Sequence, residues 1–296
     1  MVIKVLKVNY KISIICTLVI LMLCTTFVLT TTQDTQVSAN LTGKIVLPII
    51  MYHELMLNKT DKMVIAPWEF ESDLKYLKNN DYNTIDMTQL IDYVYNKTPL
   101  PSNPIILTFD DGYLNNYKYA LPLLKKYNMK AVISLIGKDT DDFTNIKSDN
   151  LDYSHVTWQQ ANDMQDSGCF ELQNHTYNLH STDLTRYGCC RNPGESLEHY
   201  EKILTNDLGK CQQAITENTG FAPNTFTYPY GSISKESISI IKKLGFKASL
   251  SCKYGVNLIN NKPEILYGLR RISRYHNISI KKTIKDAMDT LRFYKS

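Results

Sequence analysis

The sequence PIILTFDDGY (Pro104–Tyr113) joins a continuous apolar run to two adjacent carboxylates and a glycine. A short apolar run that ends in turn residues is typical of a strand buried on both faces, as in a parallel sheet. Asp110 and Asp111 then follow the carboxyl end of that strand, and adjacent carboxylates repel each other unless a cation lies beside them. The segment therefore predicts an α/β fold with charged chemistry at a strand end.

Short apolar runs and amphipathic stretches alternate along the chain beyond residue 40. The predicted strands are Ile45–Met51, Asn83–Ile85, Ile105–Phe109, Ala131–Ile136, Phe170–Gln173, Thr225–Tyr228 and Phe246–Leu250. The predicted helices are Pro67–Asn79, Met87–Tyr95, Tyr113–Tyr127, Thr157–Asp166, Glu195–Glu217, Ser234–Leu244 and Ser279–Phe293. About seven βα units predict a (β/α) barrel of parallel strands, in one domain over residues 40–296, with its chemistry at the carboxyl ends of the strands.

The composition excludes several classes of protein. Hydrophobic residues make up 43% and charged residues 21%, which is ordinary for a globular chain and not for a disordered, collagen-like or coiled-coil one. The formal net charge is +4, and three lysines and one aspartate within residues 1–39 account for half of it. The remainder is too near neutral for electrostatic binding of nucleic acid, and we expect no nucleic-acid partner.

The N-terminus has the pattern of an export signal. Lys4, Lys7 and Lys11 precede the uncharged apolar run Ile12–Leu29, and Val37-Ser38-Ala39 fits a cleavage site. Residues 1–39 are therefore interpreted as a signal peptide, or as a signal anchor with a short linker, because the run is long enough to remain in the membrane. We expect the catalytic domain outside the cytoplasm, either secreted or anchored to the outer face of the membrane, with the leader as its only membrane contact.

Five cysteines follow this leader: Cys169, Cys189, Cys190, Cys211 and Cys252. Their spacing fits no zinc finger, and an odd number in an exported chain leaves at least one unpaired. A disulfide from Cys189 or Cys190 to Cys211 or Cys169 and a set of buried free thiols both remain open.

A second polar cluster follows another predicted strand. The sequence NHTYNLH (Asn174–His180) begins where the strand near Gln173 ends, and it places His175 and His180 five residues apart. One Asp and two His form the open ligand set of a hydrolytic metal centre, with water in the remaining positions. Each cluster alone is a weak signal, but two such clusters at strand ends favour a metal site.

Five segments in this order along the chain resemble motifs of the polysaccharide deacetylase family, the carbohydrate esterases of the NodB homology type. They are Leu47–Glu54 (LPIIMYHE), Thr108–Tyr113 (TFDDGY), His175–His180 (HTYNLH), Tyr228–Gly231 (YPYG) and Leu269–Ile272 (LRRI). The resemblance covers roughly residues 45–275. The first segment and the histidine spacing are similar to the branch that includes exported deacetylases of poly-N-acetylglucosamine.

This resemblance implies a distorted (β/α) barrel that hydrolyses the acetamide of N-acetylated sugars in a cell-surface or cell-wall glycan. It implies a divalent metal, most often zinc, with cobalt or nickel as alternatives, on Asp111, His175 and His180. It also implies that Asp110 is the base that takes a proton from the attacking water.

The resemblance further implies that the backbone N–H of Tyr230 stabilises the oxyanion, with Pro229 fixing the turn. The chain departs from the family pattern at Thr227, where many members have an arginine that steadies the catalytic Asp. Arg271 is a candidate replacement for it.

The acid that protonates the leaving amine is the second departure, because the late motif lacks the usual histidine. In the branch with the Tyr-His phrase this acid comes from the N-terminal side, which here is His53, and His276 is the less favoured alternative. His155 and His199 are assigned no role.

Two rival functions remain open on this sequence. One is an inactive surface protein that binds glycan, and the other is a metal-dependent O-acetyl esterase or amidase on the same fold. The glycan itself is also open among peptidoglycan, poly-N-acetylglucosamine and chitin fragments. The loops 138–155, 181–195 and 252–268 are expected to form the groove that selects it.

Overall fold

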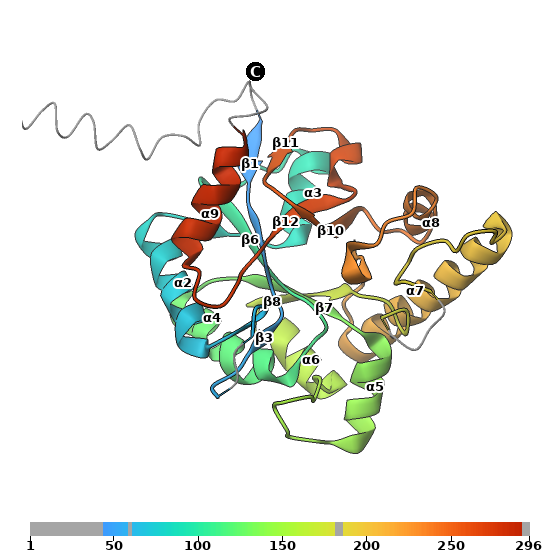
Figure 1. The fold of residues 1–296 in the computed structure, drawn as a ribbon, viewed down its shortest axis with the longest axis horizontal. Coiled ribbons are helices and arrows are strands. Elements are labelled where there is room, and N and C mark those ends of the chain that lie inside the picture. Colours follow the sequence, from blue (N-terminus) through green and yellow to red (C-terminus); the bar gives the residue numbers. More distant parts are fainter. Residues whose placement is uncertain (1–43, 59–60, 181–185, 292–296) are drawn as a thin grey trace, which may run out of the picture. The chain divides into compact units, whose positions relative to one another are not determined.

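Seven parallel strands close into a barrel with helices around it, in a computed structural model that describes residues 44–58, 61–180 and 186–291 (Figure 1). The predicted (β/α) barrel is therefore confirmed. The fold lies within a compact unit over Val46–Ser296. The predicted leader, residues 1–39, lies outside the described residues. Among the residues that are described, no helix is long and apolar enough to cross a membrane.

The order of strands around the barrel is β2-β12-β10-β9-β8-β7-β6, and a pairing of β6 with β2 closes it. These strands are β2 (Ile49–Tyr52), β6 (Pro104–Phe109), β7 (Ala131–Leu135), β8 (Phe170–Asn174), β9 (Thr225–Thr227), β10 (Ala248–Tyr254) and β12 (Leu269–Ser273). All seven run in the same direction, so their carboxyl ends meet at one mouth. The mouth receives the residues that directly follow each strand.

The membership of the barrel differs from the prediction at three places. Pro48 divides the predicted strand Ile45–Met51 into β1 (Ile45–Leu47) and β2, because proline has no N–H for a sheet ladder. The predicted strand Asn83–Ile85 is β5 (Asn83–Thr84), which pairs with the beginning of β6 and is not one of the seven barrel strands. The seventh barrel strand is instead β12, which was predicted only as a motif.

Helices connect the strands and cover the outside of the barrel (Figure 1). They are α2 (Pro67–Asn79), α3 (Met87–Asn96), α4 (Leu121–Tyr127), α5 (Gly137–Ile146), α6 (Trp158–Asp166), α7 (Leu197–Thr219), α8 (Ser237–Lys243) and α9 (Ile280–Asp289). The sequence predicted all of them except α5, which occupies part of the predicted loop 138–155. The predicted helix Tyr113–Tyr127 begins at Leu114 and passes through a π-helical turn over Asn116–Ala120 into α4.

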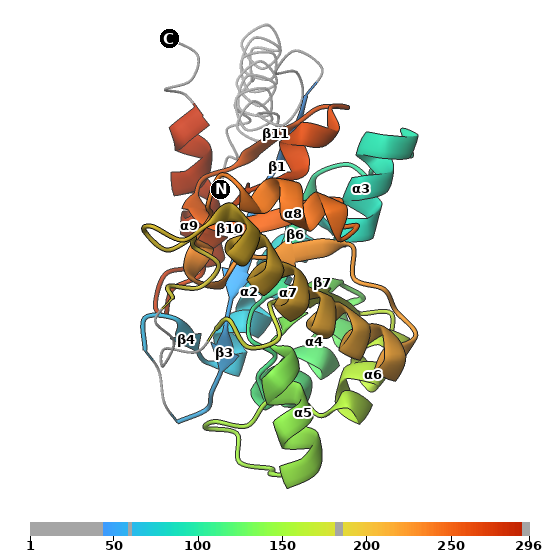
Figure 2. The ribbon, with the colours of Figure 1, turned by 90° about the vertical axis from the view of Figure 1, so that its right-hand side faces the viewer.

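Two apolar clusters hold the barrel and its outer helices together. In one cluster, the ring of Phe109 on β6 lies 5.1 Å from Tyr52, 5.4 Å from Phe70 of α2 and 5.6 Å from Phe170, measured between centroids. The second cluster lies under α7, which crosses the wall of the barrel between α8 and α6 (Figure 2). It includes Cys189, and this residue fixes the loop before α7 to the body of the protein.

Two short sheets lie outside the barrel. Strands β1 and β11 (Asn257–Ile259) form one, and β3 (Glu54–Leu55) and β4 (Val64–Ile65) form the other. The five cysteines in the described part of the chain are all free thiols, so the structure contains none of the disulfides left open by the sequence.

Candidate metal centre

The carboxyl ends of β6 and β8 bring Asp111, His175 and His180 together. One ligand atom from each residue lies within 4.8 Å of the other two. Asp111 Oδ1 is 3.3 Å from His175 Nε2 and 3.3 Å from His180 Nε2. Asp111 and His175 are buried, whereas the side chain of His180 is 21% exposed. The cluster is thus open to solvent on the side of His180.

The chemistry of these three side chains fits a divalent cation. Asp111 Oδ1 is buried and accepts no hydrogen bond, which is costly for a carboxylate oxygen unless a cation completes its surroundings. The Nδ1 of His175 lies 2.7 Å from the carbonyl oxygen of Thr227 and donates to it, so Nε2 is the nitrogen that faces Asp111 and could bind a metal. Two imidazole nitrogens and one carboxylate oxygen suit zinc and related metals.

Three residues after the strands of the mouth have left-handed backbone conformations that non-glycine residues rarely adopt. They are Asp111 (φ 70°), Thr176 (φ 75°) and Tyr230 (φ 57°). Such conformations persist only where the surrounding structure fixes them, and they concentrate at functional sites. Each one follows a different strand, so three of the nine such residues in the described part of the chain lie at the mouth of the barrel.

Asp110 is held by Arg271, which projects from β12 and is fully buried. The guanidinium donates two parallel hydrogen bonds, from Nη1 to Oδ1 at 2.7 Å and from Nη2 to Oδ2 at 2.8 Å. Its Nε–H also donates to the carbonyl of Ser251 at 2.9 Å, which fixes the plane of the guanidinium. A bidentate pair of this kind holds a carboxylate in one orientation.

Both aspartates are ionised in this environment. Burial alone would raise the pKa of Asp110, but the charge and the hydrogen bonds of Arg271 outweigh it, and the net shift is downward. Burial also opposes ionisation of Asp111, and the contact with His175 lowers the pKa of Asp111 well below its usual range. Since Arg271 neutralises only one of the two carboxylates, the mouth retains negative charge that favours a cation.

His53 follows β2, and a hydrogen bond to its backbone carbonyl holds it in place. The carbonyl oxygen of His53 accepts a hydrogen bond of 2.8 Å from the Nδ2 of Asn116, in the π-helical turn after the Asp-Asp-Gly segment. The adjacent Asn115 accepts the N–H of Leu55 at 3.2 Å and donates to Glu54 at 3.2 Å. The Nδ1 of His53 is buried and has no hydrogen-bond partner. The sequence did not single out either asparagine.

The alternative acid, His276, is tied to another part of the molecule. The ring Nδ1 of His276 lies 2.7 Å from a carboxylate oxygen of Glu69 on α2, and its backbone N–H donates to the carbonyl of Lys62. Next to it, Arg274 forms a buried pair with Asp73, at 2.7 Å from Nε to Oδ2. These contacts join β12 to α2.

Tyr230 contacts the candidate metal ligands through its side chain. Its ring lies 4.5 Å from the His180 ring, and its hydroxyl donates to the carbonyl of His180 at 2.9 Å. Pro229 precedes it in a short 3₁₀ turn over Pro229–Gly231. The ring of Tyr230 therefore lies beside the cluster of Asp111, His175 and His180, and Pro229 directly precedes it in the chain.

Buried polar atoms without a hydrogen-bond partner gather at the mouth. Among the described residues there are five: His53 Nδ1, Asp111 Oδ1, Asn116 Oδ1, His155 Nδ1 and Thr176 Oγ1. Four of them belong to segments that follow β2, β6 and β8. The fifth belongs to His155, whose backbone bridges to Tyr113 and whose ring stacks on it at 4.7 Å. The sequence assigned His155 no role, because only the fold brings it to this position.

The fold and the cluster define a (β/α) barrel with a candidate divalent-metal centre at its mouth. The family model for polysaccharide deacetylases matches residues 97–249, just over half of the chain, and the chain belongs to that family.

Curated relatives agree with this assignment. A poly-beta-1,6-N-acetyl-D-glucosamine N-deacetylase of Staphylococcus aureus is 28% identical over 187 residues, which cover 63% of this chain and 60% of that relative. The protein YxkH of Bacillus subtilis is 27% identical over 227 residues, which cover 76% of this chain and 70% of that protein. The match therefore spans about three fifths of the Staphylococcus aureus relative.

Solved structures share the fold. The deacetylase PplD of Streptococcus pyogenes superposes with a TM-score of 0.67 at 20% identity, over 82% of this chain and 99% of that one. IcaB of Ammonifex degensii gives 0.66 at 23% identity, over 82% and 96% of the two chains. A de-N-acetylase of Aggregatibacter actinomycetemcomitans gives 0.66 at 26% identity, over 81% and 99%.

Proposed function

We propose that this protein is a divalent-metal-dependent hydrolase that removes N-acetyl groups from N-acetylglucosamine residues of a cell-surface polysaccharide. Poly-β-1,6-N-acetylglucosamine is the favoured substrate. The observation that carries the proposal is the cluster of Asp111, His175 and His180 beside the Arg271-bound carboxylate of Asp110. Family membership and the name of the Staphylococcus aureus relative support the same reaction.

Asp111, His175 and His180 would hold the metal, with zinc favoured and cobalt or nickel also suited to the donor set. When bound, such an ion polarises the acetamide carbonyl and makes the attacking water more acidic. The hydrogen bond from His175 to the Thr227 carbonyl keeps Nε2 free as a ligand. This bond uses the backbone carbonyl of residue 227 and does not depend on its threonine side chain, which instead pairs with Ser134.

Asp110 would accept the proton from the attacking water. Each of its oxygens takes one hydrogen bond from Arg271 and retains a further lone pair for the water. Arg271 acts as a positioning residue, because it fixes the orientation of the carboxylate and keeps it ionised. In this way it performs from β12 the task that the family pattern gives to an arginine near Pro229.

His53 would donate the proton that the leaving amine needs. It follows β2, which pairs with β6 from Ile49–Ile106 to Tyr52–Phe109, so His53 and Asp110 come from neighbouring strands at the same mouth. The Asn116 contact fixes the backbone from which the imidazole projects.

Tyr230 and Pro229 would complete the site on the side of His180. The left-handed conformation of Tyr230 turns the backbone at this point, and the carbonyl oxygen that becomes negative in the reaction would be stabilised by the Tyr230 N–H. We further propose that the domain acts outside the cytoplasm, on the basis of the basic and apolar N-terminal pattern.

Release of acetate tests the proposal. Purified full-length protein with added zinc is incubated with β-1,6-linked N-acetylglucosamine oligomers, with chitin oligomers and with peptidoglycan, and acetate and free amine are measured. We expect equal amounts of both products from the β-1,6-linked oligomers and loss of activity after chelation, restored by zinc. Release of acetate only from O-acetyl esters would favour the esterase alternative. No release from any substrate would favour a glycan-binding protein.

A further inference from the structure

A row of aromatic rings leads away from the candidate metal centre. Tyr230 lies beside His180, with ring centroids 4.5 Å apart, and Tyr187 stacks on Tyr230 at 4.9 Å with an angle of 24° between the ring planes. Tyr187 precedes α7 and belongs to none of the motifs that the sequence singled out. The row connects a candidate metal ligand to a residue outside the proposed catalytic machinery.

The exposure of these rings increases along the row. The side chain of His180 is 21% exposed, Tyr230 is 36% exposed and Tyr187 is 64% exposed. Tyr187 therefore contributes little apolar burial to the fold, although it is a large aromatic residue in a defined stack. A rigid aromatic ring open to solvent beside a reaction centre is a typical contact surface for a polar, flat-faced ligand.

The backbone around Tyr187 is anchored at several points. The carbonyl of Tyr187 accepts the N–H of Cys190 at 3.0 Å, which closes a turn. Within that turn, the fully buried Cys189 donates its N–H to Ser232 Oγ at 3.1 Å, and its carbonyl accepts the hydroxyl of Tyr200 at 2.7 Å. These bonds attach the turn to Ser232, directly after the Pro229–Gly231 segment, on one side and to α7 on the other.

Neighbouring residues strengthen this anchoring. Arg186 forms a buried ion pair with Glu195, with 2.8 Å between Nη1 and Oε2, and it also donates to the Cys190 carbonyl at 2.6 Å. Gly188 has a φ of 53°, and a Cβ there would lie 2.9 Å from the carbonyl oxygen of Pro229. The close approach of this glycine brings the turn against the catalytic motif and sets the position of Tyr187.

We propose that Tyr187 is a substrate-binding residue, whose exposed ring face holds a second pyranose of the glycan while a neighbouring residue is deacetylated at the metal centre. The proposal rests on the proposed function. The apolar face of a pyranose, formed by its C–H groups, matches the face of a tyrosine ring. Because the ring is already held in place, little conformational entropy is lost on binding. The chain would therefore act on polymers in preference to single sugars.

Kinetics of substrates of different length test this role. The full-length zinc-loaded protein is assayed on a β-1,6-linked N-acetylglucosamine pentamer and on a small activated acetate ester, which occupies only the reaction centre. Tyr187→Ala should raise KM for the pentamer about three- to tenfold, as expected for one lost aromatic contact, with kcat within about twofold. The ester should be hydrolysed at the wild-type rate, and Tyr187→Phe should behave as wild type.

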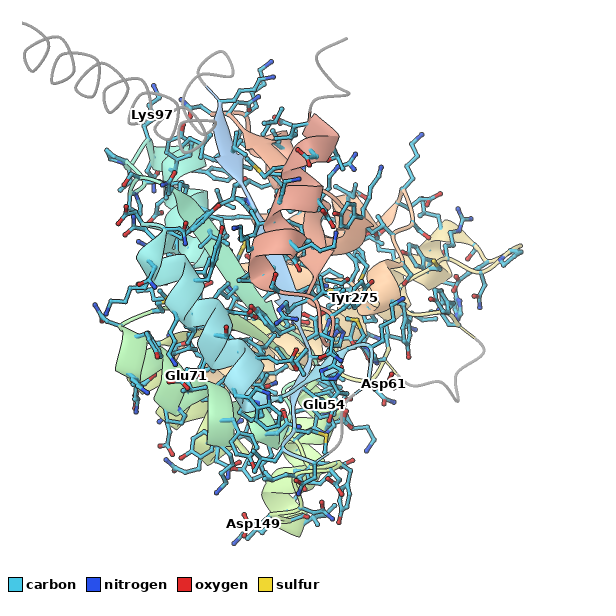
Figure 3. The ribbon with its side chains drawn as sticks, turned by 60° about the vertical axis from the view of Figure 1, so that its left-hand side comes forward. Glu54, Asp61, Glu71, Lys97, Asp149 and Tyr275 are labelled. Carbon is cyan, nitrogen blue, oxygen red and sulfur yellow. The ribbon has the colours of Figure 1, made fainter. Side chains whose placement is uncertain are left out.

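Binding gives a second readout that does not depend on catalysis. Calorimetric titration of metal-free protein with the pentamer should show Kd raised about three- to tenfold by Tyr187→Ala and unchanged by Tyr187→Phe. Tyr95→Ala is the matched control, because Tyr95 is an exposed tyrosine near the end of α3. Lys97, two residues further, lies well apart from Glu54 at the mouth (Figure 3). This control should leave both Kd and KM unchanged.

Three outcomes would overturn the inference. The first is an unchanged KM and Kd for the pentamer in Tyr187→Ala. The second is an equal loss in Tyr187→Phe, which would indicate a hydroxyl contact and not a ring platform. The third is a parallel loss on the ester, which would indicate a displaced Tyr230. Failure of the wild type to deacetylate any oligomer would contradict the proposed function instead, and the calorimetric comparison would still decide whether Tyr187 binds glycan.

Discussion

Both ends of the barrel bury acidic side chains, but the pKa values of these side chains shift in opposite directions at the two ends. At the mouth, the net shift of the pKa of Asp110 and Asp111 is downward, because Arg271 and the histidines stabilise the charge. At the amino end of β8, burial and the nearby charge of Asp86 raise the pKa of Glu171 to about 7. The carboxylates at the mouth therefore stay ionised, whereas the buried acid at the other end is easily neutralised.

The two ends also differ in how completely their buried polar groups are hydrogen-bonded. Glu171 accepts the N–H groups of Met87 and Thr88 at 3.0 Å each, at the start of α3, and the side chain of Gln173 at 2.7 Å. Gln173 in turn accepts the N–H groups of Asn224 and Thr225. In the described part of the chain, the buried side-chain atoms without partners belong instead to residues at the mouth. A closed polar network supports the fold, and an open one marks where a ligand is received.

The largest difference in kcat should be between a substitution at the mouth, Asp110→Asn, and the same kind of substitution at the other end. This change preserves the shape of the side chain but removes the proton acceptor, so kcat for deacetylation should fall about 10²–10⁴-fold while metal stays bound. The matched variant is Glu171→Gln, which makes the same chemical change at the closed network and should retain near wild-type kcat. Equal activity of the two variants would show that the two ends are not functionally distinct.

His53→Ala tests whether the mouth supplies an acid as well as a base. Loss of the proton donor should lower kcat for the amide about 10²-fold or more, because an amine is expelled only after protonation. An activated acetate ester needs little protonation and should lose far less. Equal losses on both substrates would assign His53 a structural role, and a loss confined to His276→Ala would place the acid beside Glu69.

Arg271→Lys examines the support of Asp110. Lysine keeps the positive charge but cannot form the two parallel hydrogen bonds, so kcat should fall about 10- to 100-fold. Weaker pairing should also raise the pKa of Asp110, which moves the acidic limb of the kcat/KM profile to higher pH. A lower kcat with an unshifted acidic limb of the kcat/KM profile would mean that Arg271 supports only the fold.

The smallest effect should come from the pH dependence of stability at the closed end. Glu171 has a pKa of about 7 in the folded protein and about 4.3 when unfolded, so the folded state binds more protons between these values. Its contribution to stability is therefore full below the unfolded pKa and declines as pH rises toward 7. In metal-free protein, the drop in Tm from pH 5 to pH 6 should be about 2–5 °C smaller in Glu171→Gln. An identical drop would mean that Glu171 is already ionised at pH 5.

Sequence patterns predicted the parts of the fold that follow from local order. The sequences of β6 and β7 are mostly apolar, and the polar residues directly after β6 and β8 meet because parallel strands end at one mouth. β12 was not predicted as a strand, since Leu269–Ser273 contains two arginines and reads as polar. Only the fold shows that one of them, Arg271, is buried against Asp110.

Other contributions to the site depend on contacts between distant segments. Asn115 and Asn116 hold the segment after β2, about 60 residues earlier in the chain. Tyr187 reaches Tyr230 because Gly188 and Cys189 pack against the segment that follows β9. No local pattern encodes these contacts, because each depends on the paths of two loops at once.

Metal content tests most directly whether the mouth of the barrel is a metal site. Bound zinc is measured by elemental analysis in wild type, in His180→Ala and in His276→Ala, after dialysis against a competing chelator. The two histidines have similar side-chain exposures of 21% and 26%, but only His180 belongs to the cluster. We predict about one metal ion per chain in wild type and in His276→Ala, and its loss from His180→Ala. Full metal retention and full activity in His180→Ala would contradict the account.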